Sequence, residues 1–126
     1  MLFRSVIGDE RHAAWTPDLE QVYFSARREN EVVFFHTKSR TMICADALLN
    51  LSKHDQAWTR FVASWIMWNR APGTGPLEHV MVRNRDVARR QVERILAWDI
   101  DRIILSHGAL VEGDGREVVR RAYAWL

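Results

Sequence analysis

Cysteine is almost absent from this sequence, and no apolar stretch is long. Cys44 is the single cysteine, so the chain cannot form an internal disulfide. Its place inside an apolar stretch predicts a packing role in a reducing compartment. No apolar run approaches the ~20 residues that a membrane-spanning helix needs, and the N-terminus lacks the basic and apolar regions of a signal peptide. These absences predict a cytoplasmic protein without a membrane partner.

Several sequence motifs of common binding sites are missing as well. There is no zinc-finger spacing, internal repeat or low-complexity segment. The segment Ala71–Pro76 (APGTGP) contains two glycines and predicts a loop. It lacks the Lys-Ser/Thr ending of a phosphate-binding loop, so nucleotide binding there is not expected.

Lysine is also rare, because Lys38 and Lys53 are the only lysines in a chain with a formal charge of +2. Arginines instead cluster on one predicted helix, at Arg83, Arg85, Arg89, Arg90 and Arg94. Acidic residues interrupt this cluster, which is typical of a solvated helix face. The alternative, phosphate or RNA binding by the cluster, is the weaker interpretation, and a nucleic-acid partner is not expected.

The clearest pattern that is present is a hairpin over Glu31–Asp46 (EVVFFHTKSRTMICAD). Two apolar runs, VVFF and MICA, flank a polar turn at Thr37–Arg40, which predicts two strands covered on both faces. Asp46 is expected where the second strand ends and a loop begins. A carboxylate at that place must be paired, hydrogen-bonded or bound to a metal.

A second stretch, Ala97–Gly108 (AWDIDRIILSHG), predicts a helix end, a turn and a short strand over Arg102–Leu105, followed by His107 and Gly108. Apolar residues at helical spacing predict helices over Asp55–Asn69, from Asn84 to about Trp98, and from Val118 to the end. The bulky apolar stripe of the first helix is expected in the core. It consists of Trp58, Phe61, Val62, Trp65 and Ile66.

Together, the hairpin and the second stretch resemble the C-terminal half of the metallo-β-lactamase superfamily. There, a hairpin ends in a metal-bridging Asp, and a later strand ends in a metal-binding His followed by Gly. The chain is most similar to a bacterial branch of unknown function that shows the same hairpin, the same R-I-I-L-S-H-G strand and a final helix ending in A-W-L. This resemblance, from Val22 onward, implies an α/β fold in which residues 1–126 form a single partial domain. That domain would be the C-terminal half of an αββα sandwich, with a mixed sheet and about three covering helices.

The resemblance implies that the full-length protein is a metal-dependent hydrolase, with Asp46 and His107 as ligands of zinc, iron or manganese. Its substrate would be an unidentified small molecule or ester. This sequence lacks the H-x-H-x-D-H motif that supplies most ligands in the superfamily, and a catalytic zinc needs about three protein ligands. We therefore expect this chain by itself to be inactive and to hold no cofactor, and its catalytic residues stay unknown.

A structural interpretation of the same pair is open. Asp46 could cap the following loop through backbone N–H groups, and His107 could simply hydrogen-bond to it. The chain would then be a non-catalytic binding or structural domain that keeps the fold without metals. The other histidines are predicted to be surface or capping residues: His12, His36, His54 and His79.

Two expectations concern completeness. The first five residues, MLFRS, match what a common sequencing-adapter end encodes, so Met1–Ser5 are predicted to be artefactual and the natural protein to continue upstream of Val6. Uniformly apolar strands need cover on both faces, and the predicted helices cover one. We therefore expect an exposed apolar surface on the opposite sheet face and self-association through it.

Overall fold

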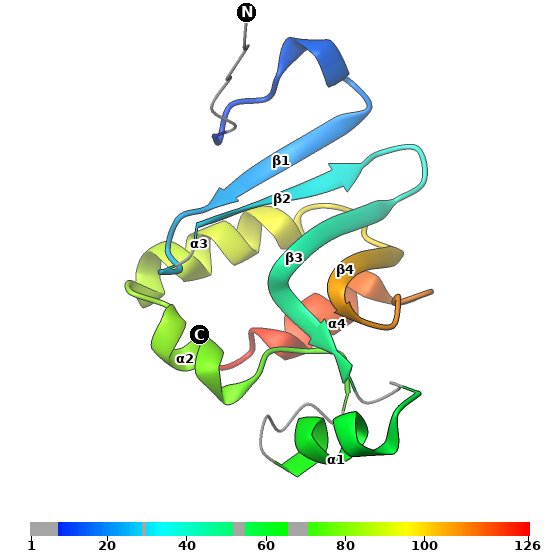
Figure 1. Cartoon of the computed structure of the whole chain (residues 1–126). Coiled ribbons are helices and arrows are strands. Elements are labelled where there is room, and N and C mark those ends of the chain that lie inside the picture. Colours follow the sequence, from blue (N-terminus) through cyan, green and yellow to red (C-terminus); the bar gives the residue numbers. More distant parts are fainter. Residues whose placement is uncertain (1–7, 29, 52–54, 66–70) are drawn as a thin grey trace, which may run out of the picture.

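The computed structural model describes residues 8–28, 30–51, 55–65 and 71–126, and the predicted artefact at Met1–Ser5 lies outside these ranges. The described residues form an α/β fold around a four-stranded mixed sheet of order β1-β2-β3-β4 (Figure 1). The strands are β1 (Leu19–Phe24), β2 (Glu31–His36), β3 (Thr41–Asn50) and β4 (Arg102–Gly108). Strand β2 pairs antiparallel with both β1 and β3, and β4 pairs parallel with β3. The predicted α/β class is confirmed.

The described helices are α1 (Ala57–Trp65), α2 (Pro76–Met81), α3 (Arg85–Leu96) and α4 (Gly115–Ala122), with a short 3₁₀ helix at Ala13–Trp15. Helices α3 and α4 lie on the same side of the sheet (Figure 1). None of the helices in the described ranges is long and apolar enough to cross a membrane.

The core lies between one face of the sheet and these two helices. Side chains alternate between the two faces of a strand, and the alternate residues that point toward α3 and α4 are buried. The strand residues in this core are Val22, Phe24, Val33, Phe35, Met42, Cys44, Ile103 and Leu105, and the helix residues are Ala88, Val92, Ile95, Val118, Val119 and Ala122.

The opposite sheet face is apolar and only partly covered. Phe34 pairs with Ile43, which pairs with Ile104, so one row of apolar side chains crosses three strands. Phe34 and Ile43 are half-buried, and Ile104 is 46% exposed. Trp15 contacts Phe34 edge-on, with ring centroids 6.3 Å apart. The expectation that both strands are covered on both faces is therefore wrong for the described residues, whereas an apolar face opposite the helices is present.

Helix α1 differs most from its prediction. The periodicity predicted Asp55–Asn69 with its aromatic stripe in the core, but α1 covers Ala57–Trp65, and residues 66–70 lie outside the described ranges. Trp58, Phe61 and Trp65 are 72%, 51% and 64% exposed. They contact each other instead, with ring centroids 5.6 and 6.3 Å apart. The stripe is amphipathic as predicted, but α1 lies beyond the end of β3, away from the sheet (Figure 1).

Helix α2 was not predicted. The breaker segment ends at Pro76, and this proline is the first residue of α2. Proline suits that position because its φ angle is already helical and its missing N–H needs no partner there. The helix matters because it carries the buried Glu78, which is 6% exposed.

Helix α3 begins at the predicted cap. The Asn84 side chain accepts hydrogen bonds from the N–H groups of Asp86 and Val87, both at 3.1 Å, and thereby satisfies two free helix donors. The helix ends at Leu96, two residues before the predicted end near Trp98. The clustered arginines of this region are all exposed, which agrees with a solvated face.

Candidate functional site

Asp46 lies inside strand β3 and not at its end, which corrects the sequence prediction. The strand continues to Asn50, since Leu49 and Asn50 pair with His107 and Gly108 of β4, and the intervening Ala47 and Leu48 are almost fully buried. The pairing with β4 shifts at this point, since Cys44 pairs with Leu105 but the next pair joins Leu49 to His107. The extra residues of β3 form a bulge around Asp46. Bulges interrupt the ladder and redirect side chains, often beside functional sites.

The bulge brings the Asp46 side chain to His107. Oδ1 of Asp46 and Nε2 of His107 are 2.7 Å apart, and the side chains are 43% and 52% exposed. An ionised carboxylate only accepts hydrogen bonds, so in a contact with such a group the imidazole is the donor. The two predicted site residues are therefore neighbours on adjacent strands, while their role as metal ligands stays a prediction.

Gly108 allows β4 to approach β3 closely just after His107. Its φ angle is +115°, and a Cβ there would lie 2.1 Å from the carbonyl oxygen of Asn50. A side chain at this position would push the two strands apart. Beyond the glycine, the Asn50 side chain donates a hydrogen bond to the Ala109 carbonyl at 2.7 Å. Close backbone contact therefore explains the glycine that follows His107.

Behind the bulge lies a buried ionic cluster that sequence reasoning missed. Arg27 contacts Glu31 at 3.3 Å and Glu78 at 2.7 Å, and the three side chains are 4–8% exposed. Burial raises the pKa of Glu31 above its ordinary value, although hydrogen bonds from backbone N–H groups and the charge of Arg27 oppose this. Nothing in the spacing of these residues indicated the cluster, because Glu78 comes from the unpredicted helix α2.

Cys44 precedes the bulge and packs in the core. It is 6% exposed, and burial raises the pKa of its thiol to about 12. A thiol with such a pKa stays protonated at neutral pH and is a poor nucleophile and a poor metal ligand. The predicted packing role is consistent with this environment.

As metal ligands, Asp46 and His107 fit in kind but not in number. Carboxylate oxygen and imidazole nitrogen suit zinc, iron and manganese, but a catalytic zinc site uses about three protein ligands. Within the described ranges, no group of three or more His, Cys, Asp or Glu side chains is placed to hold a metal ion. These two residues alone therefore do not form a catalytic metal site.

The other histidines have structural partners where the structure describes them. His12 caps the 3₁₀ helix by accepting a hydrogen bond from the Ala14 N–H. His36 is the last residue of β2, and its Nδ1 lies 2.6 Å from Ser39 Oγ. His79 stacks on Trp125. His54 lies outside the described residues.

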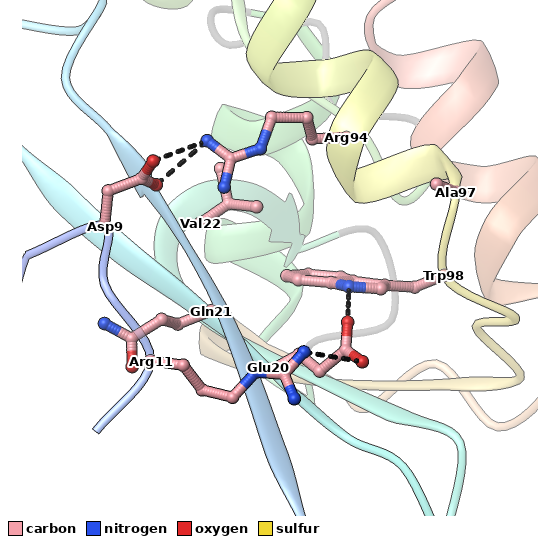
Figure 2. A pocket seen from close by; sticks show the side chains of 8 residues that line it. All are labelled: Asp9, Arg11, Glu20, Gln21, Val22, Arg94, Ala97 and Trp98. Carbon is pink, nitrogen blue, oxygen red and sulfur yellow. Dashed lines mark hydrogen bonds and ion pairs between the residues drawn. The ribbon is translucent and has the colours of Figure 1, made fainter. Parts of the chain in front are cut away.

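A separate cavity of about 440 Å³ lies beside β1, at the edge of the sheet. Figure 2 shows its charged side chains pointing toward one another. The Arg94 guanidinium binds both oxygens of Asp9, at 2.9 and 2.8 Å, and Glu20 accepts a hydrogen bond from the Trp98 indole at 2.7 Å. These charged groups already bind each other. We therefore interpret the cavity as a contact region, here called the seam, between the N-terminal segment and α3, and not as a ligand-binding site.

This seam predicts a pH-dependent contribution to stability. The hydrogen bond from Arg94 lowers the pKa of Asp9 below 3.8. A lowered pKa of Asp9 stabilises the fold at pH values above 3.8. That contribution is lost as the pH falls through the pKa of Asp9 in the folded state. We expect Asp9→Asn to lower the free energy of unfolding at pH 7 by at most about 1 kcal/mol, because the pair is half exposed. In urea titrations, the difference from wild type should vanish below the folded pKa; an undiminished difference there would contradict this assignment.

The sequence matches no protein-family model, and a comparison with curated proteins gives no match either.

Proposed function

We propose that this chain contributes Asp46 and His107 to a metal-dependent hydrolase of the metallo-β-lactamase type, and that the 126-residue chain alone is inactive. The observation that supports this proposal is the direct contact between the two side chains, 2.7 Å apart and open to solvent. The family resemblance pointed to these two residues, which are 61 positions apart in the sequence. An exposed carboxylate and imidazole in contact are groups that zinc, iron or manganese binds readily.

In this proposal, a divalent metal held by a complete ligand set supplies Lewis-acid chemistry for hydrolysis. Asp46 and His107 contribute two donors, and the other ligands lie outside the described residues. Releasing the hydrogen bond between the two side chains would free both donor atoms. The substrate is an unidentified small molecule or ester, because folds of this kind do not decide substrate.

A second candidate is a non-catalytic binding or structural domain that keeps the fold without metals. The same contact supports it, because Asp46 and His107 satisfy each other without any metal. The bulge is also held by buried groups that need no metal, as Tyr123 donates a hydrogen bond to the Ala47 carbonyl at 2.6 Å. Metal binding separates the two candidates.

We expect the purified chain to retain no stoichiometric zinc, iron or manganese after dialysis. Missing ligands cost much more affinity than the ~10- to 100-fold loss from a single change in the outer shell of a site. Added zinc should nevertheless shift the nuclear magnetic resonance signals of the His107 ring at high concentration. Asp46→Ala should weaken that effect, because one of two donors is removed.

His36 is the matched control, since its ring is hydrogen-bonded to Ser39 at the turn end of the hairpin. Its signals should not respond to the Asp46 substitution. Hydrolysis of a phosphodiester or lactone by the purified chain, abolished by Asp46→Ala, would show that the chain is already an enzyme. Zinc that never affects His107 would favour the non-catalytic domain.

A further inference from the structure

The backbone of the bulge is bound from the core side by charged and polar side chains. Both carboxylate oxygens of Glu31 are used, one by the N–H of Ala45 and the other by the N–H of Asp46 at 3.1 Å. Arg27 donates to the carbonyl oxygen of Asp46 at 3.4 Å. The peptide groups on both sides of the Asp46 side chain are therefore fixed by one buried ion pair.

These contacts replace the hydrogen bonds between β3 and β4 where the pairing of the two strands is interrupted. The register shift falls between Cys44 and Leu49, and Ala45 and Asp46 both lie within it. A buried N–H without a partner is costly, and a carboxylate is a stronger acceptor than a neutral carbonyl. Glu31 lies on the neighbouring strand β2 and reaches both N–H groups at once.

We propose that Glu31 is a positioning residue, which binds two consecutive N–H groups of the bulge and thereby aims the Asp46 side chain at His107. This role rests on the proposed function, because it matters for activity only if Asp46 and His107 form the functional site. The geometry of the pair itself does not depend on any metal. The hydrogen bonds that Glu31 accepts at the bulge come from backbone N–H groups, so it acts on the pair through the backbone.

Glu78 provides a matched control for charge. It binds the same Arg27 through both oxygens, at 2.7 and 3.0 Å, and it is as buried as Glu31. The structure gives Glu78 no hydrogen bond from the Ala45 or Asp46 N–H groups. Glu31→Gln and Glu78→Gln therefore remove the same charge from the same cluster, but only the first removes a carboxylate from the bulge.

The test is ¹⁵N nuclear magnetic resonance of the His107 ring in the full chain at fixed pH, with Asp46→Ala as the reference for a lost pair. The signal reports how much of the imidazole carries its hydrogen on Nε2. Glu78→Gln should leave this ratio as in wild type. Glu31→Gln should shift it toward the Asp46→Ala value by about threefold to tenfold, the effect of losing one hydrogen bond.

Equal shifts in the two variants would overturn the proposal, because charge alone would then explain the effect, and so would an unchanged ratio in Glu31→Gln. A measurement on wild type covers the case in which Glu31→Gln does not fold: scalar coupling across the hydrogen bonds should connect the Glu31 carboxyl carbon to the Ala45 and Asp46 amide nitrogens. Absence of that coupling would overturn the proposal as well. Failure of zinc binding would count against the proposed function alone, since neither readout here uses a metal.

Discussion

Replacing Arg27 with methionine should lower the free energy of unfolding by about 3–5 kcal/mol, the usual cost of breaking a buried ion pair by removing one partner. The Arg27 side chain is 4% exposed and is the cation shared by Glu31 and Glu78. Without it, two buried carboxylates face each other with no positive charge between them. Urea unfolding monitored by tryptophan fluorescence measures the loss.

The neighbouring Arg28 is exposed, so Arg28→Met should change the free energy of unfolding by no more than about 0.5 kcal/mol. The deficit of Arg27→Met should shrink as the pH falls. Unpaired buried carboxyls have raised pKa values, and a raised pKa gives stability that is present at low pH and lost as the pH rises. A deficit below about 1 kcal/mol at pH 7 would mean that the cluster is not buried as described.

Two phenylalanines should respond very differently to truncation. Phe24 is fully buried and packs edge-on against the ring of Tyr123, with centroids 5.8 Å apart. Phe24→Ala should cost about 3–5 kcal/mol, through lost burial and the cavity that remains. Phe61 of α1 is 51% exposed, so Phe61→Ala should stay within about 0.5 kcal/mol of wild type.

This pair of substitutions tests where the aromatic stripe of α1 lies. Urea unfolding of both variants gives the comparison directly. If Phe61→Ala costs as much as Phe24→Ala, then α1 packs into the core, as its periodicity predicted. A small cost for Phe61→Ala together with a large one for Phe24→Ala agrees with the structure.

Much of the fold could be predicted from local patterns. The hairpin, the turn at Thr37–Arg40, the Asn84 cap and the existence of strand β4 depend on hydrophobic period and turn chemistry, which can be read from the sequence. The end of β4 was predicted wrongly, because the strand runs through His107 to Gly108 and does not stop at Leu105. The position of α1 could not be predicted in this way. Periodicity shows that a helix has an apolar face, but it does not show whether anything covers that face.

The candidate site was predictable in part. Asp46 and His107 stood out because each comes directly after an apolar run in the sequence. In the structure both lie within strands, β3 and β4, and their side chains are in contact. The bulge did not stand out, because the apolar residues after Asp46 fit a covering loop as well as a continuing strand. The cluster of Arg27, Glu31 and Glu78 depends on three separate segments meeting, which no local pattern reports.

The most direct measurement of the central claim is an anomalous diffraction map from crystals of this chain soaked in excess zinc. We predict a partly occupied zinc ion held by a carboxylate oxygen of Asp46 and a ring nitrogen of His107, and no such ion in crystals of Asp46→Ala. Zinc bound elsewhere, while Asp46 and His107 stay hydrogen-bonded to each other at 2.7 Å, would contradict the claim that this pair is half of a metal site.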